Sequence, residues 1–271
     1  MLDRKHVYMR KSLLFLLVVA RLAGHDLYLM PKKFRVDPGE TLTVAFHSGD
    51  DFPKAQHAPK LDRMLEPTVF TAGGKAPLKN LRMTQKYLLA DVTIPEPGSA
   101  IVSVRSRPSL INLQPAQFTK YLKNEGLDHV IRWRADNNQS GKVGRERYSK
   151  YVKSLVVSGK SNDTYRQLVG FPIEIVPEKD PALARVGDNM PVRVLFRGKP
   201  AADLQVEMAW LAPDGKVNKE PAGRTDQNGH LEIPIRSSGT WKLHTVLMKR
   251  CQEPSVADWE SFWASLTFQV H

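Results

Sequence analysis

The stretch Thr41-Leu42-Thr43-Val44-Ala45-Phe46 decides the fold class, because its large apolar residues alternate with polar or small ones. A period of two is typical of a β-strand with one buried face. Pro38-Gly39 precedes the stretch and Ser48-Gly49-Asp50 follows it, and both are turn signals. We therefore expect a strand here, in the first part of a β-rich domain.

Similar strand-length segments, separated by turns rich in proline and glycine, continue along the chain. We predict them at 69–70, 87–94, 100–105, 148–157 and 171–176 and, after the linker-like stretch 177–181, at 191–196, 204–210, 230–235, 240–248 and 265–270. A helix is predicted to begin near Pro115 and to end near Arg134, with a break at Gly126 as an alternative. The sequence thus predicts a mainly β protein with two β-sandwich domains, residues 25–178 and 179–271, and one inserted helical segment.

The N-terminus has the order of an export signal. Basic residues within 4–11 precede the apolar run 13–20, which is too short to span a membrane. Residues 1–24 are therefore predicted to be a signal peptide, with cleavage after Ala20 or after Gly24, and the second choice makes His25 the new N-terminus. We expect a periplasmic or secreted protein that meets the membrane only through this signal, before cleavage.

Composition excludes several classes of function. The formal net charge is +12, but residues 1–24 hold five basic residues and one acidic one, so the rest carries +8, mostly scattered. We therefore predict no nucleic-acid partner. The single cysteine, Cys251, excludes an internal disulfide framework and a multi-thiolate metal site.

The local motifs of common enzymes are missing from the sequence. It has no paired cysteine spacing, no glycine-rich phosphate loop and no Gly-x-Ser-x-Gly elbow. We therefore predict that the protein is not an enzyme. A hydrolase remains an alternative that would need a nucleophile within reach of a histidine in a pocket.

The strongest candidate site is His25-Asp26. A histidine at a chain terminus offers both its α-amine and its ring nitrogen to one metal, and late first-row metals favour nitrogen ligands. The alternative is that His25 simply begins a strand. His47 and His57 flank Asp50-Asp51 and could supply imidazole and carboxylate ligands, or could belong to a solvated loop.

Two late segments are further candidates. Strand alternation puts His244 and Met248 on one face of the segment 241–248, either as a shared site or as packing in a half-buried strand. Trp259 and Trp263 could form a ligand wall or a corner that packs over the sandwich edge. His129, His230 and His271 are interpreted as surface histidines.

Several stretches together resemble a known family. They are His25-Asp26-Leu27-Tyr28-Leu29, Gly49-Asp50-Asp51-Phe52-Pro53, the segment 144–151, Glu174-Ile175-Val176-Pro177, Thr225-Asp226-Gln227-Asn228-Gly229 and the segment 258–266. The likeness covers nearly the whole predicted mature chain. It is to the periplasmic family labelled domain of unknown function 4198, which is grouped with periplasmic components of cobalt and nickel uptake systems.

We expect both sandwiches to be immunoglobulin- or transthyretin-like, and the resemblance implies a last domain like a transthyretin or carboxypeptidase-regulatory sandwich. It also implies a periplasmic accessory that binds nickel or cobalt for a membrane uptake transporter. Members commonly begin with His-Asp, which favours cleavage after Gly24 and His25 as a ligand. We expect His25 to be the main metal ligand, with Asp26 and His47 assisting. One feature departs from the family: members often have histidine before the late methionine, where this chain has Leu247 before Met248. The alternative is a non-catalytic envelope module that binds a protein or carbohydrate without metal.

Overall fold

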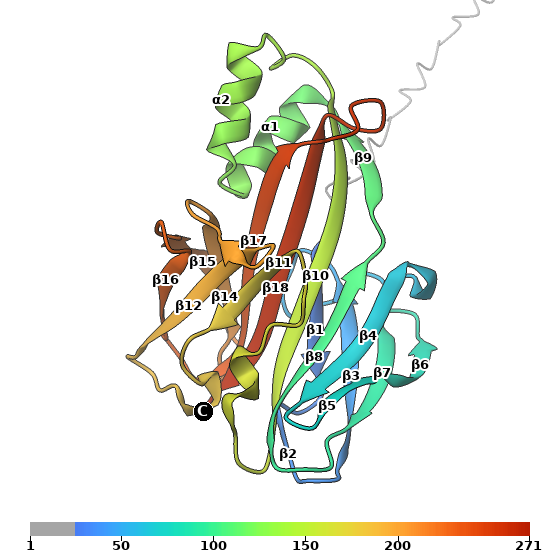
Figure 1. Cartoon of the computed structure of the whole chain (residues 1–271), viewed down its shortest axis with the longest axis vertical. Coiled ribbons are helices and arrows are strands. Elements are labelled where there is room, and N and C mark those ends of the chain that lie inside the picture. The colour runs from blue at the N-terminus through green and yellow to red at the C-terminus, as the bar shows by residue number, and fades with distance from the viewer. Residues whose placement is uncertain (1–24) are drawn as a thin grey trace, which may run out of the picture.

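The structure, a computed structural model, describes residues 25–271 and shows a mainly β protein with two short α-helices (Figure 1). The predicted signal peptide, residues 1–24, lies outside the described residues. Within residues 25–271, no helix is both long enough and apolar enough to cross a membrane. The predicted fold class is confirmed.

The first sheet covers one face of the N-terminal half. Its antiparallel strands lie in the order β1 (Leu27–Pro31), β3 (Thr41–Ser48), β7 (Leu88–Thr93) and β6 (Lys79–Met83). The alternating stretch that begins at Thr41 forms β3, as predicted. Strand β1 is at the edge of this sheet, so one side of its backbone is free to bond elsewhere.

The second sheet extends through the whole molecule. Its main path is β15 (Val217–Arg224), β14 (Gln205–Leu211), β17 (Gly239–Arg250), β18 (Trp259–Val270), β10 (Gly144–Ser158), β8 (Gly98–Ser106), β4 (Met64–Thr71) and β5 (Gly74–Pro77). Two short strands, β2 (Arg35–Val36) and β9 (Ser109–Leu113), also pair with β10. Strands β10 and β18 are parallel and sit at its centre.

The third sheet covers the C-terminal half. It consists of β11 (Ile173–Pro177), β12 (Asn189–Phe196), β13 (Lys199–Pro200) and β16 (His230–Pro234), all antiparallel. The predicted division of the chain after residue 178 assigns the segment of β11 to the N-terminal domain. In the structure β11 pairs with β12, on the C-terminal side of that division.

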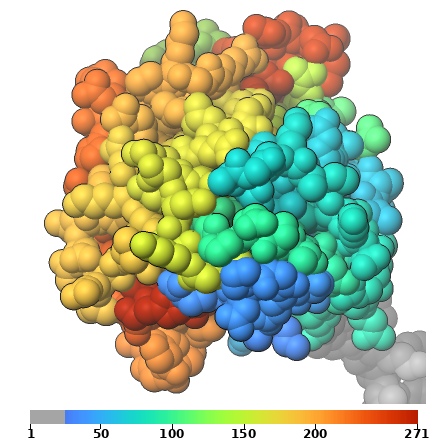
Figure 2. Space-filling model, turned by 60° about the horizontal axis from the view of Figure 1, so that its bottom comes forward, coloured from blue at the N-terminus to red at the C-terminus, as the bar shows by residue number. Residues whose placement is uncertain are grey.

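Strand β10 contributes to two cores, because successive side chains of a strand point to opposite faces. Val152 and Val156 belong to the apolar core beneath the first sheet, whereas Tyr151 and Leu155 belong to the core beneath the third sheet. The second sheet is therefore the shared layer of two sandwiches. At the end of the molecule near β2, yellow-green residues lie between the cyan and green N-terminal side and the orange C-terminal side (Figure 2).

The helices α1 (Pro115–Asn124) and α2 (Asp128–Asp136) pack beside the upper part of β17 and β18 (Figure 1). The predicted helix is broken where Gly126 has a φ of 65°, a left-handed conformation that glycine adopts without strain. Trp259 and Trp263, which could have formed a ligand wall, are buried in the core beneath the helices. They are the packed corner of the sandwich edge.

A buried ion pair connects the central strand to the third sheet. Lys153 Nζ on β10 lies 2.9 Å from Glu174 Oε2 on β11, and the two side chains are only 3% and 4% exposed. The Glu174 carboxylate also accepts hydrogen bonds from the backbone N–H groups of Val169, Gly170 and Phe171. Burial penalises both charges, so each depends on its partner.

We expect Lys153→Met to lower the free energy of unfolding by about 3 kcal/mol, because it leaves the Glu174 carboxylate buried without its cation. Urea unfolding followed by circular dichroism measures the change. The matched control is Lys33→Met, which removes the cation of the exposed pair with Glu40 and should change stability little. A loss no larger than that of the control would show that this pair does not anchor β11.

Candidate functional site

Strand β1 lies against a polar face of the second sheet. We call Lys150, Lys242, His244, Ser265 and Thr267 the inner polar face, since alternation points them toward β1. The Ser265 hydroxyl donates to the Leu27 carbonyl at 2.9 Å, and the Thr267 hydroxyl donates to the Leu29 carbonyl at 2.6 Å. These bonds satisfy the free edge of β1 and fix residues 25 and 26 at its start.

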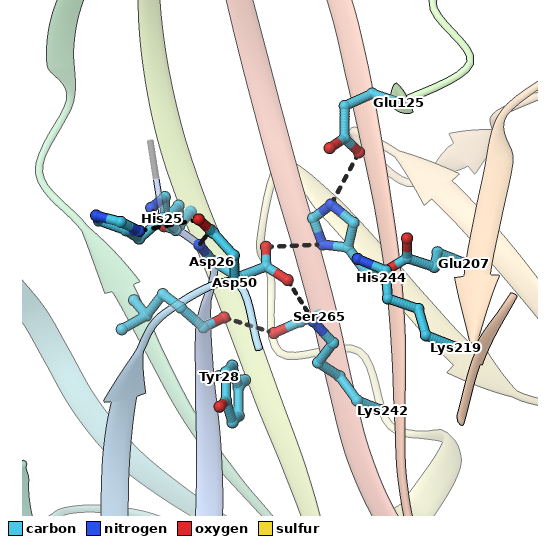
Figure 3. Close-up of polar contacts among 12 residues, drawn as sticks. His25, Asp26, Tyr28, Asp50, Glu125, Glu207, Lys219, Lys242, His244 and Ser265 are labelled. Atoms are coloured by element: carbon cyan, nitrogen blue, oxygen red, sulfur yellow. Dashed lines mark hydrogen bonds and ion pairs between the residues drawn. The ribbon is translucent and has the colours of Figure 1, made fainter. Parts of the chain in front are cut away.

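Asp26 is buried between two cations of the inner polar face (Figure 3). Its Oδ2 accepts a hydrogen bond from Lys242 Nζ, and its Oδ1 lies 3.3 Å from His244 Nδ1, an ion-pair contact without hydrogen-bond alignment. Burial alone would raise the pKa of Asp26, but His244 and Lys242 outweigh it and hold the pKa below its usual range. Asp26 therefore remains a carboxylate, paired within the protein.

His244 continues this network to the helices. Its Nε2 lies 3.2 Å from Oε2 of Glu125, which follows α1 directly. Burial lowers the pKa of His244, but the carboxylates of Asp26 and Glu125 act the other way and raise it overall. A chain of alternating charges thus runs from the residue before β1 to the residue after α1, buried at Asp26 and His244 and partly exposed at Glu125.

His25 points away from Asp26, toward the opposite side of β1 (Figure 3). Its Nδ1 lies 3.1 Å from Asp50 Oδ2, and its ring packs edge-on against His57 with ring centroids 4.8 Å apart. The His25 carbonyl accepts a hydrogen bond from Lys150 Nζ. The Asp50 carboxylate also accepts a hydrogen bond from the Asp26 backbone N–H at 3.4 Å. The carbonyl and the N–H of the peptide group between His25 and Asp26 are therefore both hydrogen-bonded.

The loop after β3 delivers Asp50 and His57 to this place. The Gly49 N–H donates to the Asp26 carbonyl at 3.0 Å, and the Gln56 N–H donates to the Ser48 carbonyl at 2.9 Å. A side chain at Gly49 would come within 3.0 Å of the Lys54 carbonyl oxygen, so the close return of the loop favours glycine there. The predicted loop therefore has a defined shape that faces the start of β1.

His47 lies elsewhere in the first sheet. Its ring packs between Tyr28 and Tyr87, with centroids 5.2 and 4.8 Å away, and its Nδ1 lies 2.9 Å from the Pro53 carbonyl oxygen. Burial lowers the pKa of His47 to about 4, so this imidazole is neutral near pH 7. Its contacts are those of a core histidine.

The structure separates the side chains that were predicted to bind a metal together. Asp26 contacts Lys242 and His244, whereas His47 contacts Pro53 and two tyrosines. The side chains beside His25 are those of Asp50 and His57. Within residues 25–271, no cluster of three or more His, Cys, Asp or Glu side chains has the arrangement of a metal site. The assignment of metal ligands stays a prediction.

Sequence reasoning missed the cations that hold this region. Lys150 and Lys242 are only 8% and 1% exposed, although lysine is rarely buried unless it is paired. Their only sequence signal is a lysine on one face of an otherwise apolar or aromatic strand, as in Trp241-Lys242-Leu243. That pattern does not reveal the partner, which for Lys242 is 216 residues away in the chain.

We expect Asp26→Asn to lower the free energy of unfolding at pH 7 by about 3–5 kcal/mol, since Lys242 would stay buried without a carboxylate. Because the pKa of Asp26 is lowered in the fold, its contribution is present above the ordinary aspartate value of 3.8 and is lost as pH falls. The difference between the two proteins should therefore shrink toward pH 3. Urea unfolding at both pH values, with Asp163→Asn as an exposed control, measures this, and a pH-independent difference would contradict it.

Comparisons with known proteins add one assignment. No curated protein matches the chain. Among solved structures, three N-terminal domains of the bacteriophage RB49 Highly Immunogenic Outer Capsid protein (Hoc) match at 13% identity over 89% of this chain and 59% of that one, with a TM-score of 0.19 that supports no inference. A family model described as "Domain of unknown function (DUF4198)" matches residues 22–249, most of the chain. The chain therefore belongs to this family of unknown function.

Proposed function

We propose that this protein is a periplasmic or secreted accessory that binds a divalent transition metal, nickel or cobalt, and presents it to a membrane uptake transporter. The metal would be cargo rather than a catalytic cofactor. The observation that carries the proposal is the position of His25, whose Nδ1 lies 3.1 Å from an Asp50 oxygen and whose ring lies against His57. Two donor atoms at that separation suit one ion at bond lengths of about 2.0–2.2 Å.

Cleavage after Gly24 would add the ligand that the side chains lack. The freed α-amine of His25 and its own Nδ1 can bind one ion together, as a chelate. An α-amino group has a pKa near ~8, so it loses its proton near neutrality much more readily than lysine does. Nickel and cobalt favour such nitrogen ligands.

The surroundings of His25 support this role. Its carbonyl is held by Lys150, and the following N–H by Asp50, so the first residue of the mature chain would be fixed before metal arrives. Burial lowers the pKa of His57, and the neighbouring His25 and Lys150 lower it further. A neutral His57 ring has a lone pair available for a metal.

The exported protein is expected to begin at His25, because basic residues and then an apolar run precede it. N-terminal sequencing, or intact-mass measurement of protein recovered from the cell envelope, determines the first residue. A start at Arg21 would leave an amide in place of the free amine and would remove the chelate.

The mature protein should have an affinity for nickel or cobalt about ten times that of His25→Ala or higher, because the substitution removes the ring nitrogen of the chelate. Affinity should fall between about pH 8 and about pH 6, where amine and imidazole take up protons. Calorimetric titration of both proteins at both pH values gives the affinities and the stoichiometry.

A variant of the mature protein with one extra alanine before His25 tests the contribution of the α-amine alone. It keeps every side chain but converts the α-amine of His25 into a peptide amide. This variant should bind the metal as weakly as His25→Ala does. His271→Ala is the control, because this exposed histidine lies beside residues 32–35 at another part of the surface. Equal binding by the mature protein and His25→Ala would reject the proposal, and an envelope module that recognises a protein or carbohydrate would then be the better hypothesis.

A further inference from the structure

A groove of about 450 Å³ opens beside the His25 ring, between the turn at Leu61–Arg63, β9 and β10. Its charged walls are cationic: Lys60, Arg63 and Lys150 line it, together with the His25 and His57 rings. Of the residues that the structure describes, no aspartate or glutamate lines the groove. The charge of its walls therefore favours an anionic ligand.

Lys150 is the cation at the inner end of this groove. It is 8% exposed, and its Nζ lies 5.3 Å from the Tyr148 ring centroid and 5.4 Å from that of Trp263. Its hydrogen-bond acceptor is the neutral carbonyl of His25, and it forms no ion pair with any carboxylate in the part of the chain described. Asp26, Asp50 and Glu146 act on this ammonium group only from beyond ion-pair distance. An anion that enters the groove would add a counter-charge in direct contact with it.

Part of the lining of the groove is apolar. Ile111 of β9 and Met64 of β4 line it, and strand alternation places both on the face of the sheet that carries Lys150. A fully hydrophilic anion such as phosphate would leave these side chains in contact with water. A ligand with one anionic head and a short apolar tail would satisfy both parts.

We infer that this groove binds a small organic carboxylate, whose head group pairs with Lys150 and whose short apolar tail packs on Ile111 and Met64. The Lys150 ammonium donates to a carboxylate oxygen without losing the His25 carbonyl, because an ammonium group has three donors. This binding goes beyond the proposed metal site and needs no metal.

Hexanoate is the probe for this inference. The purified protein, freed of metal with EDTA, is titrated at pH 7 with hexanoate, acetate, hexanol and inorganic phosphate, and binding is followed by calorimetry or by NMR shifts. We expect hexanoate to bind more tightly than the other three. Lys150→Met, which removes the ammonium group but keeps most of the length of the side chain, should weaken hexanoate about tenfold or more, and exposed Lys160→Met should not.

Met64→Ser tests the apolar part separately and should weaken hexanoate but not acetate. Leu110→Ser is its control, because Leu110 is exposed and points to the opposite face of β9, so this substitution should change neither affinity. Binding of hexanol as tight as that of hexanoate, or binding of phosphate without hexanoate, would overturn the inference, and so would no binding at all. Because the titration is done without metal, its failure leaves the nickel experiment unaffected, and a failure of nickel binding leaves this inference standing.

Discussion

The parallel pairing of β10 with β18 is the constraint on which both sandwiches depend. Each strand sends alternate side chains to opposite faces, so one sheet supplies half of two cores. On β10, Val156 packs under the first sheet and Leu155 under the third. The two halves therefore share a layer instead of touching through a small surface, and the start of β1 is held against the centre of the molecule.

Buried charge explains why His25 and Asp26 occupy such defined positions. Asp26 lies between Lys242 and His244, and His25 is held by Lys150 and Asp50. Because a charge taken out of water needs a well-placed partner, the contacts of Asp26 and of Lys150 have little freedom to shift. The contact between His25 and Asp50 is different, since these side chains are 25% and 36% exposed. The residues that precede β1 are thus attached to β10 and β17 of the central sheet.

Periodicity and turn residues were enough to predict β3, β10 and β17, and the break at Gly126, because these depend on short-range patterns. Pairing between distant segments was not predictable from local patterns, so the shared sheet and the placement of β11 beside β12 were missed. The same limit applies to the site. His25, Asp50 and His57 were identified as candidates, but the separation of Asp26 and His47 from them depends on Lys242 and Pro53, which only the fold brings near.

The second sheet, which both sandwiches share, also constrains the order in which the chain folds. Ser154 on β10 and Thr267 on β18 are bonded to each other, yet they are 113 residues apart in the chain. The chain loses conformational entropy when so long a loop closes, and the stabilising contacts between the two strands form only afterwards. Such long-range pairing slows folding. A growing chain that still lacks the twelve residues of β18 has an open edge along β10 and an unfinished layer in both sandwiches. Neither half can become fully native until β18 has joined the shared sheet.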